Sequence, residues 1–120
     1  MPKVMLVDDD RTTATLLETL LSLDGFDVVL AARSGEVLES ARRERPDAFL
    51  IDYHLSGGMN GAEIIRQLRA EPAFQRAPII MTSGMNVEDA ALRAGANLFL
   101  IKPFDPTQLP NLLNQLLSAV

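Results

Sequence analysis

Short runs of apolar residues recur along the chain, and four of them stop at a polar side chain. The run Phe49–Ile51 shows no polar alternation, which is typical of a strand that is buried on both faces within a parallel sheet. This run ends on Asp52. The other three runs end in the same way: Val4–Val7 before Asp8, Asp9 and Asp10, Ile79–Met81 before Thr82 and Ser83, and Leu98–Ile101 before Lys102. A further short strand is predicted at Asp27–Ala31.

Helices are predicted between these strands, because apolar residues there recur at helical spacing. Possible N-caps precede the segments, at Asp10, Ser34, Asn60, Asn86 and Asp105. The first helix is predicted to bury a stripe made of Leu16, Leu17, Leu20, Leu21 and Leu23 and to end at Gly25. Strands that alternate with helices in this way predict an α/β fold: a doubly wound, five-stranded parallel sheet with helices on both faces.

Length and composition narrow the class of protein. The 120 residues predict a single domain, 1–120, and the absence of cysteine excludes disulfides and thiolate metal sites and agrees with a cytoplasmic protein. The apolar runs are far shorter than the roughly 20 residues that span a bilayer, so no membrane partner is expected. A net charge of −5 and a pI near 4.7 argue against direct nucleic-acid binding.

Carboxylates are expected to meet at one edge of this sheet, because the carboxyl ends of parallel strands lie together. Asp8, Asp9 and Asp52 would repel one another there unless they held a proton or a cation. Ligands that are all oxygen favour a hard ion such as Mg²⁺. An aspartate beside Mg²⁺ can attack a phosphoryl group, and Ser83 and Lys102 could bind the phosphoryl oxygens.

Each of these residues taken alone is more often a solvated helix start, a turn or a surface charge. Their joint placement after four separate strands favours a site. With these residues in this order along the sequence, the chain resembles, over its whole length, the receiver domains of two-component response regulators, which have a flavodoxin-like fold. The motifs that carry the resemblance are Val7-Asp8-Asp9-Asp10, Asp52, Ser83-Gly84, Ala94-Gly95-Ala96 and Lys102-Pro103-Phe104.

The resemblance implies a role for each matched residue. Asp52 would accept a phosphoryl group from a histidine kinase or a histidine phosphotransfer protein. Asp9 and Asp52 would ligate Mg²⁺ directly, Asp8 would act through water, and the His54 backbone carbonyl would be a further metal ligand. The Lys102-Pro103 peptide bond would be cis. Such a domain catalyses only its own phosphorylation and dephosphorylation, and is otherwise not an enzyme.

The resemblance also implies a switch. Ser83 would follow the phosphoryl group, and Phe99 occupies the position of the aromatic residue that then moves inward, although a simple core phenylalanine is an equal interpretation. The face made by the fourth helix, fifth strand and fifth helix would change with it and could bind a partner or a second copy. The side chain of His54 is expected to be an exposed loop imidazole rather than a metal ligand or a phosphorelay histidine.

Two departures from the family pattern bear on the loops. The loop Ser56–Gly61 lacks the usual proline and is slightly longer, and the segment from Ser83 to Lys102 is shorter by nearly one helical turn. The first departure puts the conformation of the loop after Asp52 in question. The second makes the face beside the fourth helix the least transferable part of the resemblance.

Two other functions compete with the receiver hypothesis. Asp8 to Thr12 fits the Asp-x-Asp-x-Thr signature of haloacid dehalogenase-like phosphatases, with Asp8 as nucleophile and Asp10 as acid/base. That class needs a further acidic pair after a later strand, which the sequence lacks, and it leaves Asp52 and Lys102 unexplained. A receiver-like module that binds partners without phosphorylation is disfavoured, because every catalytic position is filled.

Overall fold

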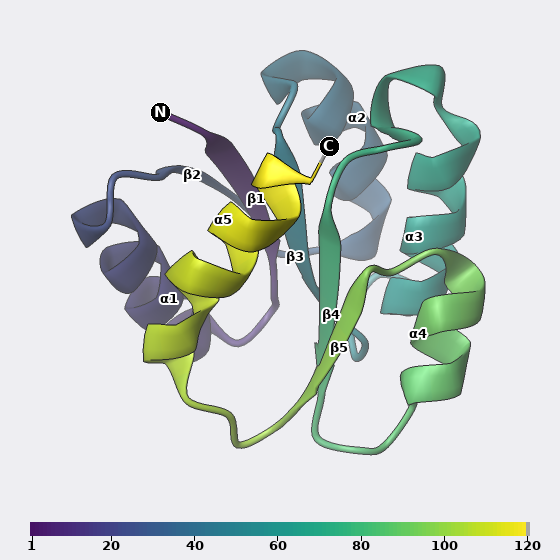
Figure 1. Cartoon of the computed structure of the whole chain (residues 1–120). Helices are drawn as coiled ribbons and strands as arrows, with labels where there is room; N and C mark the ends of the chain where they lie inside the picture. Colours follow the sequence, from purple (N-terminus) through teal and green to yellow (C-terminus); the bar gives the residue numbers. More distant parts are fainter. Residues whose placement is uncertain (120) are drawn as a thin grey trace.

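The computed structural model describes residues 1–119, in which five parallel strands alternate with five α-helices (Figure 1). The strands are β1 (Lys3–Val7), β2 (Asp27–Ala31), β3 (Ala48–Asp52), β4 (Ile79–Ser83) and β5 (Leu98–Ile101). The helices are α1 (Arg11–Leu23), α2 (Ser34–Glu44), α3 (Gly61–Ala70), α4 (Glu88–Ala94) and α5 (Leu109–Ser118). Single 3-10 turns at Pro72–Phe74 and Pro106–Gln108 precede β4 and α5. The predicted α/β fold is confirmed.

The order of the strands creates a crevice at the centre of the sheet. The order is β2-β1-β3-β4-β5, so the chain turns to one side of β1 for β2 and to the other side for β3. Ligands of such sheets bind beyond the carboxyl ends of the strands at this switch point. Val7 pairs with Ile51 in register, which brings Asp8 and Asp52 to neighbouring positions where the two strands end.

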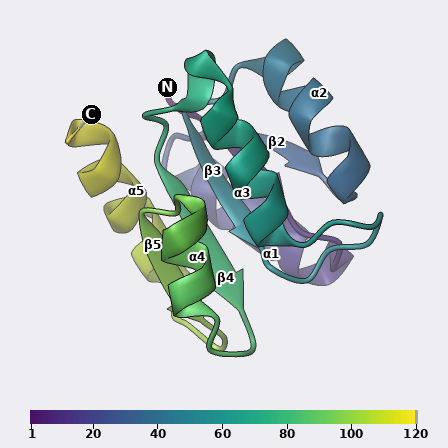
Figure 2. The same ribbon diagram turned by 90° about the vertical axis from the view of Figure 1, so that its right-hand side faces the viewer.

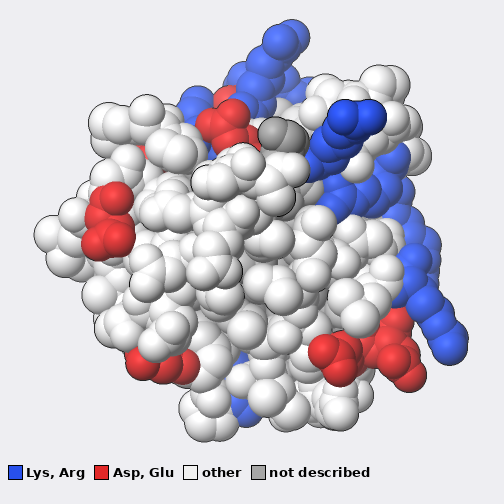
Figure 3. Space-filling view, in the orientation of Figure 1, with Lys and Arg blue, Asp and Glu red and all other residues white. Residues whose placement is uncertain are grey.

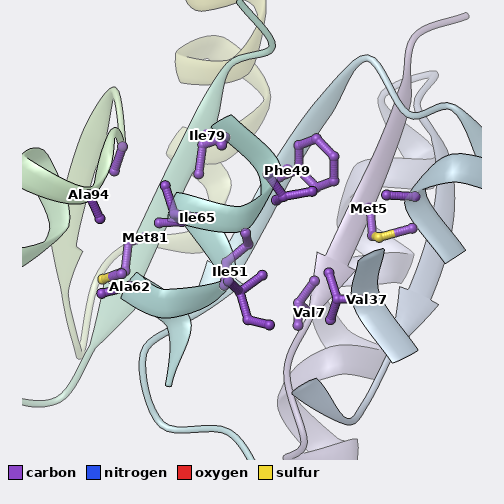
Figure 4. Packing of buried hydrophobic residues seen from close by; sticks show 14 of the residues in the cluster. Met5, Val7, Val37, Phe49, Ile51, Ala62, Ile65, Ile79, Met81 and Ala94 are labelled. Carbon is purple, nitrogen blue, oxygen red and sulfur yellow. The ribbon is translucent and has the colours of Figure 1, made fainter. Parts of the chain in front are cut away.

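Alternate side chains of the central strands point into two hydrophobic clusters, one on each face of the sheet. The cluster under α2, α3 and α4 contains Met5, Val7, Phe49, Ile51, Ile79 and Met81 (Figure 4). The cluster under α1 and α5 contains Val4, Leu6, Ala48, Leu50 and Ile80. The two views of the ribbon show the corresponding layers, with the sheet between them (Figure 2). Burial on both faces explains why these strands are apolar without alternation.

The predicted stripe of α1 is only partly right. Leu17 and Leu21 are buried, and Ala14 completes their face of the helix. Leu16 and Leu23 are exposed instead, at 52% and 79%. The buried residues are spaced by three and four positions, so leucines beside them in sequence are turned away by about 100° each.

Several predicted helix starts are confirmed, but Ser34 is not the N-cap of its helix. Asp10 and Asn60 cap α1 and α3 with their side chains. The cap of α2 is Arg33, and Ser34 is its first residue, buried with its hydroxyl turned inward. The helix predicted to have Asn86 as its N-cap begins at Glu88, with Val87 as its N-cap, and the Asn86 side chain accepts a hydrogen bond from the Glu88 amide at 3.2 Å.

None of the helices within residues 1–119 combines the length and the apolar character that crossing a lipid bilayer requires.

Gly61 allows α3 to begin directly against the end of β3. Its amide donates a hydrogen bond to the Tyr53 carbonyl at 2.8 Å. A β-carbon at this position would lie 2.5 Å from the carbonyl oxygen of Asp52 and 2.9 Å from the α-carbon of Tyr53. Both neighbours are backbone atoms, so they cannot move aside cheaply. The first residue of α3 therefore has to be glycine if β3 is to keep its position.

We expect Gly61→Ala to lower the free energy of unfolding by about 1–3 kcal/mol, because the added methyl group overpacks a backbone contact. Gly35→Ala is the matched control, since a β-carbon at that helical position would meet no described atom within 4 Å apart from its chain neighbours and the backbone of its own helix. The control should raise stability by about 0.5–1 kcal/mol. Urea unfolding measures both variants. If the two variants were equally stable, a methyl group at position 61 would make no unfavourable contact with β3.

Candidate functional site

Three carboxylates meet where β1 and β3 end. Asp8, Asp9 and Asp52 each offer an oxygen atom, and these atoms lie within 4.8 Å of one another. Asp8 and Asp52 are buried, at 6% and 7% exposure, whereas Asp9 is exposed. The structure therefore brings together the three acidic residues that the sequence singled out.

Lys102 supplies the positive charge of this cluster. Its Nζ lies 3.4 Å from Oδ1 of Asp52 and 3.9 Å from Oδ2 of Asp8. The residue follows β5, and its amide donates to the Ser83 carbonyl at 2.8 Å, which holds it at the end of β4. The Lys102-Pro103 peptide bond is cis, as the resemblance implied. A single ammonium facing three carboxylates leaves the site with an excess of negative charge.

Asp52 carries an oxygen that lacks a hydrogen bond. Oδ1 is fully buried and accepts none from any residue in 1–119, and the Lys102 ammonium at 3.4 Å is farther than a well-formed hydrogen bond. Burial raises the pKa of the Asp52 carboxyl, and the charge of Lys102 offsets this only in part. Because buried polar atoms are almost always hydrogen-bonded, this oxygen is a candidate ligand for a cation or a candidate nucleophile.

Two backbone amides orient the other carboxylates. Oδ1 of Asp8 accepts a hydrogen bond from the Asp10 amide at 2.9 Å, and Oδ2 of Asp9 accepts one from the Ser56 amide at 3.1 Å. Burial nevertheless raises the pKa of Asp8, and the hydrogen bond from Asp10 counteracts it only partly. The cluster consists of oxygen donors only, so its chemistry fits a hard divalent cation such as Mg²⁺.

Asp10 is engaged elsewhere, as the N-cap of α1. Its carboxylate accepts hydrogen bonds from the Thr12 amide at 3.2 Å and from the Thr13 hydroxyl at 2.7 Å. The bond from Thr13 lowers the pKa of Asp10. A carboxyl with a lowered pKa that is bound by two donors of its own helix is poorly suited to the acid/base role that the phosphatase hypothesis gives it.

The remaining predicted residues lie around the cluster. Ser83 is fully buried at the end of β4, and its hydroxyl accepts a hydrogen bond from the Met85 amide at 3.1 Å. Phe99 is half-buried against the cluster that contains Met81. The imidazole of His54 is exposed and lies edge-on to the ring of Tyr53, at 5.0 Å between centroids.

An open polar cleft lies beside the cluster, lined by Asp9, Asp52, Lys102 and the loop that follows β3. Sequence reasoning missed the part that this loop takes through the Ser56 amide, because a backbone donor has no side-chain signature. It also missed the contact of the Ser34 hydroxyl with this loop, because Ser34 was predicted to be an ordinary N-cap.

Comparison with known proteins gives a consistent result. The family model described as the response regulator receiver domain matches residues 4–114. The phosphate regulon transcriptional regulatory protein PhoB of Rhizobium meliloti is 32% identical over 91% of this chain and 49% of its own length. The DNA-binding response regulator MtrA of Mycobacterium tuberculosis is 36% identical over 89% of this chain and 46% of its own length. The chain thus spans about half the length of the curated relatives it matches.

Solved structures show the same likeness. A response regulator from Chloroflexus aurantiacus is 33% identical with a TM-score of 0.90, and 98% of each chain is covered. The receiver domain of a sensor histidine kinase from Pseudomonas aeruginosa is 31% identical with a TM-score of 0.87, again with 98% of each chain covered. That second structure is described as having a magnesium ion coordinated in its active-site cleft.

We expect Asp8→Asn to raise the free energy of unfolding of the metal-free protein at neutral pH. Because the folded-state pKa of Asp8 is raised above 3.8, its ionised form costs stability once the pH exceeds that range. The gain should shrink as the pH falls through the raised pKa and vanish below 3.8. Urea unfolding in a chelator, repeated from acid to neutral pH, measures it.

Asp105→Asn is a control for which we expect the opposite change in the free energy of unfolding. Asp105 is exposed, and the Thr107 hydroxyl lowers its pKa, so the ionised form stabilises the fold. Its replacement should lower stability at neutral pH, with the loss disappearing in acid. A neutral-pH stability of Asp8→Asn below that of the parent would contradict our account of the cluster.

Proposed function

The chain belongs to the family of response regulator receiver domains, the phosphoaccepting signalling domains of two-component systems, and we propose that Asp52 is the residue that takes up its phosphoryl group. The observation that carries this proposal is the buried Oδ1 of Asp52, which has no hydrogen bond within residues 1–119 and lies 3.4 Å from Lys102. A nucleophilic oxygen needs a free lone pair and a nearby positive charge to receive the transferred group.

The other two carboxylates suit supporting roles. The Asp8 carboxylate is tied to the Asp10 amide and the Asp9 carboxylate to the Ser56 amide. Asp52 and Lys102 both line the open cleft, where a phosphoryl donor could approach. Asp52 differs from the other two carboxylates in that its buried Oδ1 lacks a hydrogen bond within residues 1–119 and lies 3.4 Å from the ammonium of Lys102.

The reaction proposed is a phosphoryl transfer from a phosphohistidine. A carboxylate oxygen of Asp52 bonds to phosphorus, the P–N bond breaks, and its electron pair returns to the imidazole nitrogen of the donor. The product is an acyl phosphate. The Lys102 ammonium is close enough to pair with a phosphoryl oxygen, and the Ser83 hydroxyl keeps its own hydrogen to donate while it accepts from Met85.

We propose that Mg²⁺ binds at the same place, held by Asp9 and Asp52, with Asp8 acting through water and the His54 carbonyl as a further ligand. The three converging carboxylates support this, and so does the Oδ1 of Asp52, which accepts no hydrogen bond within residues 1–119. When bound, the ion would neutralise the negative charge that develops on the phosphoryl oxygens. The chain's own residues provide the nucleophile, the ammonium and the hydroxyl.

The proposed partners are a histidine kinase or a histidine phosphotransfer protein as donor, and a second copy or another protein at the face of α4, β5 and α5. The α5 part of this face is uncharged, because α5 carries no charged residue between Leu109 and Ser118, whereas α4 contributes Glu88, Asp89 and Arg93. Charged side chains lie around the uncharged surface of α5 (Figure 3). The uncharged surface of α5 can approach a partner without the repulsion that a net charge of −5 creates elsewhere.

With a small acyl-phosphate donor and Mg²⁺, we expect the protein to gain one phosphoryl group and Asp52→Asn to gain none. Chelation of Mg²⁺ should abolish the gain, because it removes the cation that would compensate the charge of the phosphoryl oxygens. Asp9→Ala should reduce the gain severely, because it removes a ligand of that cation. Intact-mass spectrometry measures the label. Asp105→Asn is a control that keeps the cluster intact. Labelling that survives in Asp52→Asn and disappears in Asp8→Asn would favour the phosphatase hypothesis.

We propose further that phosphorylation repacks the start of α4. The other end of this short helix is tied down, because the Arg69 guanidinium donates to the Gly95 carbonyl at 2.8 Å and to the Asn97 side chain at 2.9 Å. The segment Gly84–Asn86, which follows Ser83, is exposed. Differential contacts of Ser83 and Lys102 with the phosphoryl group would therefore move the Gly84 end of the helix.

A beryllofluoride mimic of the phosphoryl group should change amide exchange at residues 84–87 and at Phe99, but leave residues 95–97 near Arg69 unchanged. Exchange followed by mass spectrometry or NMR, with and without the mimic, measures this. Asp52→Asn treated in the same way is the control. Changes that stay within the loop after Asp52 would mean that the domain carries phosphate without switching.

A further inference from the structure

The loop between β3 and α3, residues 53–60, rests on the start of α2. The Ser34 amide donates to the Ser56 carbonyl at 2.9 Å, and the Met59 amide donates to the Ser34 hydroxyl oxygen at 3.2 Å. Arg33 and Ser56 also form an isolated parallel bridge. Ser34 is 1% exposed, so its hydroxyl is an interior group whose contacts water cannot easily replace.

The contact between loop and helix is close. Gly57 has a φ of +103°, and a β-carbon there would lie 2.8 Å from the Ser34 hydroxyl oxygen. Gly58 has a positive φ as well, at +98°. A loop with two adjacent glycines and no proline has high conformational freedom of its own, so outside contacts must hold it in one conformation. Ser34 provides two such contacts.

The anchored loop reaches the carboxylate cluster through Ser56. While its carbonyl is bound by the Ser34 amide, its own amide donates to Oδ2 of Asp9 at 3.1 Å. Within residues 1–119 this is the one hydrogen bond that the Asp9 carboxylate accepts. Asp9 is exposed, so packing does not restrain its side chain. The Ser34 amide thus holds the residue that orients Asp9, while the Ser34 hydroxyl, which is the group that Ser34→Ala removes, holds the same loop at Met59.

We propose that Ser34 is a positioning residue for the cation site: it holds the loop so that the Ser56 amide orients Asp9. This inference rests on the proposed function, because it takes Asp9 as a ligand of Mg²⁺. Ser34 does not touch the cation. It reduces the conformational freedom that Asp9 and the loop lose when the cation binds, which raises affinity by pre-organisation.

The test compares Ser34→Ala with Ser40→Ala, a control on the same helix whose hydroxyl contacts only the Arg43 side chain, at 3.4 Å. Ser34→Ala should raise the Mg²⁺ dissociation constant roughly threefold to tenfold, the effect of losing about one hydrogen bond. Calorimetric titration measures it. In metal-free protein, amide exchange at Ser56 and Met59 should accelerate in Ser34→Ala, while exchange in the β3 core stays unchanged. Ser40→Ala should match the parent in both.

Gly57→Ala perturbs the same contact from the loop side and should weaken Mg²⁺ binding in the same direction, which keeps the test decisive if Ser34→Ala folds poorly. Unchanged Mg²⁺ affinity and unchanged exchange at Ser56 in a folded Ser34→Ala would overturn the proposal, and so would faster exchange with unchanged affinity. A parent protein that neither binds Mg²⁺ nor is labelled at Asp52 would instead overturn the proposed function, and the exchange measurement would then still report on the anchor alone.

Discussion

The structure depends on the burial of like charges at the end of two central strands. Asp8 and Asp52 are neighbours because β1 and β3 pair directly, and their burial raises the pKa of both carboxyls. Lys102 is the only ammonium close to them among the described residues. A fold that holds charges in this way is less stable than it could be, and a cation bound at the cluster would relieve the repulsion. The electrostatic cost of the cluster therefore favours the binding of a cation.

The surrounding elements hold the cluster rigid. Two hydrophobic layers cover the sheet, so the strands that carry the carboxylates cannot shift. Gly61 lets α3 start against the backbone of β3, and the Lys102 amide is tied to the end of β4. Pre-organisation of this kind places the proposed nucleophile, Asp52, and the ammonium of Lys102 before any donor arrives, which reduces the cost of reorganisation.

The two ends of α4 differ in how firmly other residues hold them. Arg69 is partly buried and binds backbone carbonyls around the end of α3, the entry to β4 and the end of α4, which makes that side of the molecule a fixed point. The residues after Ser83 are exposed and lack such a tether. In the proposed switch, this difference between the two ends would direct a small change at the site into a movement of the Gly84 end of α4.

The sequence by itself determined the fold class and the residues of the cluster, because both follow from local signals: apolar runs that end on Asp52, Ser83 or Lys102, and caps such as Asp10 and Asn60. Tertiary structure alone decided which leucines of α1 face inward, that Ser34 turns into the interior, and that the Ser56 amide binds Asp9. These features depend on contacts between segments far apart in the chain, and in part on backbone groups that every residue possesses. Local sequence carries no signal for them.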